Sequence, residues 1–307
     1  AGDSSSLISE VPSYNDHSKL LMVVDRAGSL IEVTDPESWG LRRYHVVSNI
    51  QRHLQAPSAF VARVALDVEI ESEQEIALQD VASEQSIQGI QIRQISYSLD
   101  ANQRTRAQLY LPKGTARGSC NALVCMRQNP SDTDHERAME LARRGYVCIL
   151  PDWTGDVKTS PAYDDVWQVQ RAIDVLQACE IVHGERLGYI GDAAFGQLGL
   201  YAAAIDQRLV AIYCDAEEAT SLAILQTASN HSLAELIATS APRALRINLP
   251  RHAQLAQLVQ DQAQIAREVF ELRNVPQRLT WNHSGQMEEI YVWLEESFRR
   301  PQPRFAR

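Results

Sequence analysis

One short stretch near the middle of the chain most constrains its fold. An apolar run over 187–190 is followed at once by a turn bracketed by Gly191 and Gly196, and then by an alanine-rich segment with helical periodicity. A strand that passes through a sharp turn directly into a helix is typical of a strand and its crossover helix in a parallel sheet. Glycine lets the backbone bend there without a Cβ clash. We therefore predict a parallel strand, a tight turn and a helix at this point.

Short apolar runs alternate with helical segments from residue 121 onward. The candidate parallel strands are 122–126, 146–150, 187–190, 210–213, 244–249 and 278–281. The candidate helices are 133–144, 164–179, 194–205, 233–239, 255–272 and 286–298. This alternation predicts an α/β fold with a mostly parallel central sheet and helices on both faces.

The N-terminal segment follows a different pattern. Two apolar runs around Gly28, within residues 20–33, predict a short hairpin. Thr34 and Pro36 then predict a helix to about residue 54, with Thr34 as its cap. Inside that helix an aromatic residue and two arginines, Trp39, Arg42 and Arg43, are expected at the surface.

Residues from about 60 to 112 alternate between apolar and polar side chains. Apolar residues occupy every second position from Val64 to Ile70, and again from Ala107 to Leu111. Such alternation is typical of half-buried antiparallel strands. We expect these strands to form the leading antiparallel part of the sheet.

Length and composition favour one main domain. A chain of 307 residues that is 45% hydrophobic can bury a single large core. We expect residues 1–58 to form an N-terminal arm, hairpin and helix, 59–300 the α/β domain, and 301–307 a C-terminal tail.

Charge and residue usage exclude several classes of function. The formal net charge of −10 disfavours nucleic acid and anionic membrane surfaces. No apolar run reaches the ~18 residues that span a bilayer. The five cysteines and eight histidines lack the spacing of metal ligands, so we expect no metal site. The chain also lacks a glycine-rich phosphate loop, so we expect no nucleotide cofactor. Because the chain begins with Ala1, a soluble protein could be cytoplasmic or exported with its signal peptide removed.

Four motifs resemble one group of enzymes. Residues 141–152 resemble the "LAxxGYxxLxPDx" run of acetyl xylan esterase and dienelactone-hydrolase-like α/β-hydrolases. Residues 163–191 are similar to their "D…RAIDxL…xRIGxxGxSxGG" run, which ends in the nucleophile elbow. Residues 241–245 resemble their "APRPLL" and 291–294 their "AYxWL". The motifs occur in the family's order over about residues 20–300, so the resemblance implies an α/β-hydrolase fold and a carboxyl-ester hydrolase ancestry.

The same alignment implies a degenerate active site. The family's serine falls on Ala193 and the glycine two residues later falls on Phe195, which would crowd the turn. The segment 249–255, where the family places its catalytic acid, contains no carboxylate. The resemblance implies backbone N–H groups of Arg127, Gln128 and Ala194 as oxyanion donors.

The remaining triad members have candidates. Attack on an ester needs a nucleophile, a histidine to take its proton and an acid to orient that histidine. His283 follows the last strand and is the candidate base. Asp215 and Glu217, with Glu218 beside them, are weak acid candidates, and a solvated loop carboxylate is the alternative interpretation of each. Asp192 precedes the nucleophile position by one residue and is expected to be a surface or capping residue.

Two hypotheses follow from the sequence. The first is a pseudoenzyme with a binding or assembly role, whose partner is a small-molecule ester or carbohydrate, another protein or a second copy of the chain. The second is a serine esterase or deacetylase of carbohydrate or small esters in which alanine replaces the nucleophile.

Overall fold

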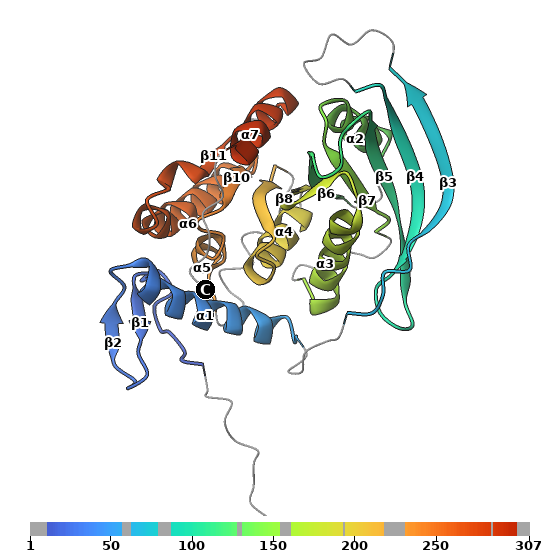
Figure 1. The fold of residues 1–307 in the computed structure, drawn as a ribbon. Helices are drawn as coiled ribbons and strands as arrows, with labels where there is room; N and C mark the ends of the chain where they lie inside the picture. Colours follow the sequence, from blue (N-terminus) through green and yellow to red (C-terminus); the bar gives the residue numbers. More distant parts are fainter. Residues whose placement is uncertain are drawn as a thin grey trace, which may run out of the picture.

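The computed structural model describes residues 11–56, 63–78, 87–127, 131–153, 161–192, 194–217, 231–283 and 285–299. Its main strands are β3 (Glu69–Ala77), β4 (Gly89–Ser98), β5 (Arg104–Lys113), β6 (Cys120–Met126), β7 (Val147–Pro151), β8 (Val182–Asp192), β9 (Leu209–Asp215), β10 (Ala244–Asn248) and β11 (Leu279–Asn282). They form one sheet in the order β11-β10-β9-β8-β6-β7-β5-β4-β3 (Figure 1). The strands from β6 to β11 are parallel to one another, and β3, β4 and β5 are antiparallel.

Helices cover both faces of this sheet. The apolar side chains of α2 (Asp132–Arg143) and α7 (Met287–Arg299) belong to the hydrophobic core of one face. The core of the other face includes α3 (Tyr163–Ala178), α4 (Ala194–Ile205) and α6 (Ala253–Leu272), with α5 (Leu233–Ala238) packed against them. A 3-10 turn, η2 (Pro276–Arg278), leads into β11. The predicted α/β class and the predicted parallel sheet are therefore confirmed.

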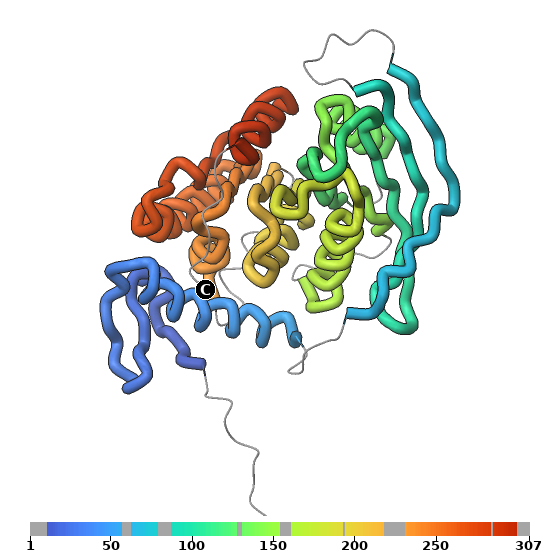
Figure 2. Tube along the Cα trace, viewed as in Figure 1, coloured from blue at the N-terminus to red at the C-terminus, as the bar shows by residue number. Residues whose placement is uncertain are grey.

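The N-terminal hairpin and helix are also confirmed. Strands β1 (Met22–Val24) and β2 (Leu30–Glu32) pair antiparallel, and α1 (Pro36–His53) follows. These elements lie at the opposite side of the molecule from β3 (Figure 1, Figure 2). The predicted cap is wrong, because Asp35 rather than Thr34 accepts the backbone N–H groups of Glu37 and Ser38, at 2.9 and 2.8 Å.

The surface interpretation of α1 is also wrong. Trp39 is only 2% exposed and Arg42 is completely buried. The guanidinium of Arg42 lies 3.4 Å from the centre of the Tyr14 ring and forms an ion pair with the buried carboxylate of Glu235 in α5. Because the segment before α1 and the helix α5 both pack on α1, Trp39 and Arg42 lie inside the molecule.

The first strand of the sheet begins later than its apolar alternation predicts. Residues 63–68 form no strand, and β3 is exposed along almost its whole length. Four glutamates of β3 form ion pairs with neighbouring basic residues: Glu69 with Arg104, Glu71 with Arg106, Glu73 with Arg93 and Glu75 with Lys113. Because this edge strand has no buried face, its sequence does not alternate between hydrophobic and polar residues. Its charged side chains disfavour pairing with the edge strand of another molecule, and so oppose aggregation.

Candidate functional site

The candidate site lies where the parallel strands end. Asp192 is the last residue of β8 and stands opposite Asp215, the last residue of β9. Asn248, at the end of β10, stands opposite Asp215 in turn. Since parallel strands share one carboxyl edge, these side chains meet beside the turn that leads into α4.

The turn between β8 and α4 is as tight as the sequence predicts. A Cβ on Gly191 would lie 2.5 Å from the carbonyl oxygen of Phe195, and one on Gly196 would lie 3.2 Å from that of Asp215. The hydroxyl of Tyr189 donates to the Phe195 carbonyl at 2.7 Å. Ala193 lies outside the described residues, and Ala194 is the first residue of α4.

Phe195 packs into the core beside the turn. Its side chain is 2% exposed, and its ring contacts that of Trp153 edge-on, with 5.4 Å between the ring centres. A large apolar side chain therefore occupies the position where the resembled enzymes have glycine.

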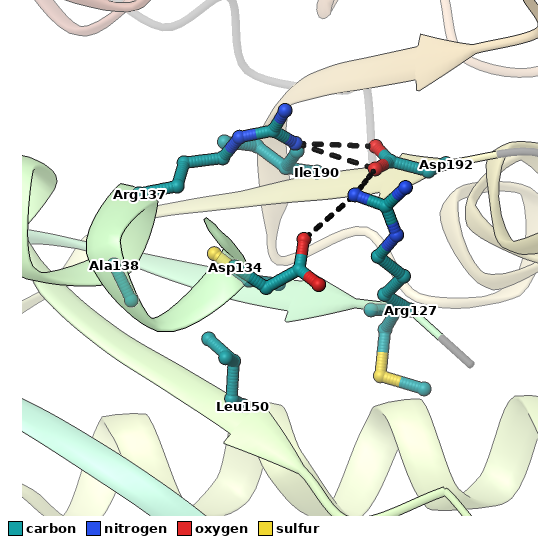
Figure 3. Close-up of a pocket in the computed structure, with 9 residues that line it drawn as sticks. Arg127, Asp134, Arg137, Ala138, Leu150, Ile190 and Asp192 are labelled. Atoms are coloured by element: carbon teal, nitrogen blue, oxygen red, sulfur yellow. Dashed lines mark hydrogen bonds and ion pairs between the residues drawn. The ribbon is translucent and has the colours of Figure 1, made fainter. Parts of the chain in front are cut away.

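Two arginines hold Asp192. Nη1 of Arg127 lies 2.9 Å from Oδ2 of Asp192, and Nη1 of Arg137 lies 3.3 Å from the same oxygen (Figure 3). Arg127 also reaches Oδ1 of Asp134 at 2.7 Å. The side chain of Asp192 is only 14% exposed. The prediction of a surface or capping residue is therefore wrong, because α2 and the end of β6 cover Asp192.

The electrostatics of this cluster are asymmetric. Burial raises the pKa of Asp192, and the charges of Arg137 and Arg127 oppose the rise only in part. Burial also acts on Asp134, but hydrogen bonds from Ser131 and Arg127 outweigh it, so the pKa of Asp134 is lowered. Asp134 is therefore the more stable anion of the two.

Only a small cavity remains within the cluster. Its volume is about 20 Å³, which holds roughly one water molecule. Its lining residues are Cys125, Met126, Arg127, Asp134, Arg137, Ala138, Leu150, Ile190 and Asp192. The cavity is therefore much smaller than the roughly 300 Å³ of ordinary small-molecule sites.

Asp215 and Glu217, the predicted acid candidates, form their hydrogen bonds and ion pair with residues other than Arg127 and Arg137. Oδ1 of Asp215 accepts from Nδ2 of Asn248 at 2.9 Å and from the backbone N–H of Glu217 at 3.0 Å. Oε1 of Glu217 pairs with Nε of Arg251 at 2.6 Å. His283 follows β11, is exposed, and forms no hydrogen bond or ion pair with a described residue. Gln128 and Glu218 lie outside the described residues.

Sequence reasoning missed the side chains of Asp134 and Arg137. Both lie in α2, three residues apart, on the helix that follows β6. The signal for them was available, because a helix that follows a parallel strand begins at the carboxyl edge of the sheet. Arg127 was predicted only as a backbone donor, and its side chain is the central cation of the cluster.

The described residues contain no group of three or more histidine, cysteine or acidic side chains that could hold a metal ion. The five cysteines are free thiols. No helix in the described ranges combines the length and apolar character needed to cross a lipid bilayer.

Comparisons with known proteins identify the fold. No family model and no curated protein matches the sequence. Among solved structures, a glucuronoyl esterase from Solibacter usitatus has a TM-score of 0.65 at 16% identity and covers 94% of this chain and 98% of its own. The chain has the α/β-hydrolase fold. A glucuronoyl esterase from Teredinibacter turnerae has a TM-score of 0.64 at 12% identity, with 90% and 88% covered. An acetyl xylan esterase from a Paenibacillus species has a TM-score of 0.51 at 13% identity, with 82% and 93% covered.

In α/β-hydrolase terms, β8 and α4 are the strand and helix of the elbow. The structural neighbours are carbohydrate esterases, as the sequence motifs had indicated. At these identities the likeness concerns the fold, and any activity must be argued from the residues of this chain.

Proposed function

We propose that this chain is a catalytically inactive protein of the α/β-hydrolase fold that acts by binding or assembly. The observation that carries the proposal is the alanine at position 193, between the end of β8 and the start of α4. Acyl transfer begins when a nucleophile bonds to the carbonyl carbon, and a methyl group has no lone pair for that bond. The likeness of the fold to carbohydrate esterases supports an ester hydrolase ancestry.

Three features around the elbow support the proposal. Asp192 engages both Arg127 and Arg137, and the cavity between them has a volume of about 20 Å³. Phe195 is buried against Trp153. The cavity beside Asp192, the residue that precedes position 193, therefore holds about one water molecule, which is far less than a substrate acyl group needs.

A serine esterase with its nucleophile replaced by alanine is the second candidate. One observation favours it: Asp215 stands opposite Asp192 in the register of β9 and β8, next to the elbow. His283 follows β11 at the same carboxyl edge of the sheet. An acid and a base could therefore approach a serine at position 193 if the side chains rearranged.

The test is the variant Ala193→Ser, assayed with a short-chain aryl ester. The proposal predicts that turnover stays at the level of the unchanged chain, because no histidine–acid pair is ready to activate the serine. Loss of the nucleophile from a working triad lowers kcat by roughly 10⁶-fold, so restoring it to an intact site would raise turnover by several orders of magnitude. Such a rise would refute the proposal and favour the esterase.

A second variant controls for the crowded turn. Ala193→Ser combined with Phe195→Gly restores both elbow positions of the resembled family. If this double variant keeps its thermal unfolding transition and is still inactive, the defect extends beyond the elbow, as the proposal requires. High turnover by the double variant alone would show that Phe195 is the principal block and that the triad survives.

A further inference from the structure

A second pocket lies at the edge of the sheet opposite the elbow. Its volume is about 390 Å³. Its wall is formed by α1 and by Gln207 and Ala241, which precede β9 and β10. The elbow lies at the carboxyl ends of these parallel strands, and this pocket lies at their amino ends. An inference about it is therefore independent of the proposed function.

The pocket is rich in hydrogen-bond donors. The guanidinium of Arg273, at the end of α6, is partly buried and forms no hydrogen bond or ion pair with a described residue. Trp39 also lines the pocket, but its Nε1 is buried inside the protein and is not among the donors exposed there. Arg43 also lines the pocket and donates to the carbonyls of Ala204 and Thr239, at 2.9 and 3.2 Å.

The charge of the lining is positive. Arg43 and Arg273 face a single acidic residue, Glu37, which lies exposed in the first turn of α1. Burial lowers the pKa of Arg43 to about 10, and it also lowers the pKa of Arg273. A buried cation is stabilised by a negative charge placed beside it, so this environment favours an anion.

Apart from Gln207, the remaining wall is mainly apolar or aromatic. The ring of Tyr44 is 61% exposed, and Val47 and Ala241 also line the pocket. We propose that the pocket binds a small organic anion, whose carboxylate or phosphate accepts hydrogen bonds from Arg273 and whose apolar part packs on Tyr44. The volume falls within the range of about 300–1,000 Å³ that such sites usually have.

The proposal is tested by titrating the full chain with benzoate, phenyl phosphate and inorganic phosphate, followed by calorimetry and by the indole N–H signals in nitrogen-15 NMR spectra. We expect saturable binding of benzoate or phenyl phosphate, with one indole N–H signal shifted because Trp39 lines the pocket that the anion occupies. The tighter of the two identifies the anionic group. Absence of saturable binding by all three up to about 10 mM would overturn the proposal, as would equal binding of all three, since the apolar wall would then contribute nothing.

Two variants with partly or fully exposed side chains locate the site. Arg273→Gln should weaken the organic anion about tenfold or more, because it removes a charge-assisted hydrogen bond. Tyr44→Ala should weaken benzoate or phenyl phosphate and leave inorganic phosphate unchanged. Arg26→Gln removes the same charge from the exposed turn between β1 and β2 and should have no effect. Unchanged affinity in Arg273→Gln, or equal loss in Arg26→Gln, would contradict the proposed site.

Discussion

Acidification should destabilise this protein through one buried histidine, His231. Its side chain is 2% exposed, and a hydrogen bond of 3.0 Å joins its Nε2 to the hydroxyl of Tyr201. The ring of His53 lies edge-on, with 5.1 Å between the ring centres. Burial, and then the neighbouring His53 and His17, lower the pKa of His231 from 6.5 to about 3. The native state therefore keeps this imidazole neutral.

The sign and size of the effect follow from linkage. Because the native pKa lies below the unfolded value, the unfolded state binds more protons as the pH falls, and the native state loses stability. The contribution is fully present above about pH 6.5 and declines as the pH falls toward 3. Each pH unit below 6.5 costs about 1.4 kcal/mol, so the 1.5 units down to pH 5 cost about 2 kcal/mol.

The assay is urea unfolding at pH 7.5 and pH 5.0 for the unchanged chain and for His231→Gln. Glutamine can still bond to Tyr201 but does not titrate, so the variant should lose about 2 kcal/mol less than the unchanged chain between the two pH values. Carboxylates titrate in both proteins and cancel in the comparison. His252→Gln, at an exposed position before α6, is the matched control and should behave like the unchanged chain. A difference below about 0.5 kcal/mol between His231→Gln and the unchanged chain would refute the reasoning.

Two further predictions concern stability near neutral pH, both measured by urea unfolding. Arg42→Met leaves the buried carboxylate of Glu235 without its arginine and should lower the free energy of unfolding by about 3 kcal/mol or more. A loss under about 1 kcal/mol would contradict this, and would show that His17, at 2.8 Å from Glu235, replaces Arg42 as the partner of that carboxylate. Gly191→Ala places a Cβ 2.5 Å from the Phe195 carbonyl oxygen and should cost about 2 kcal/mol. Gly184→Ala in β8, whose Cβ meets nothing within 4 Å, should change stability by less than about 0.5 kcal/mol, and an equal loss in both would contradict the steric argument.

Local periodicity was enough to predict most of the architecture. The six predicted parallel strands and the helices between them correspond to β6–β11 and α2–α7. Each of these elements buries at least one side. The burial produces a periodic pattern of apolar residues that can be recognised within a short stretch of sequence. The position of the edge strand β3 was predicted too early in the chain, because β3 buries almost nothing and has no hydrophobic alternation of its own. Likewise, the burial of Trp39 and Arg42 depends on α5 and on the segment before α1, which lie beside α1 only after folding.

The candidate site divides in the same way. The sequence alone determined that position 193 carries a methyl group in a strand–turn–helix unit, because residue identity and local periodicity need no partner. Only the tertiary structure decided that Asp192 is buried between Arg127 and Arg137, and that Asp215 bonds to Asn248 instead of His283. The physical reason is that burial and charge pairing arise between segments far apart in the chain, and only the packing of the sheet edge brings those segments within contact distance.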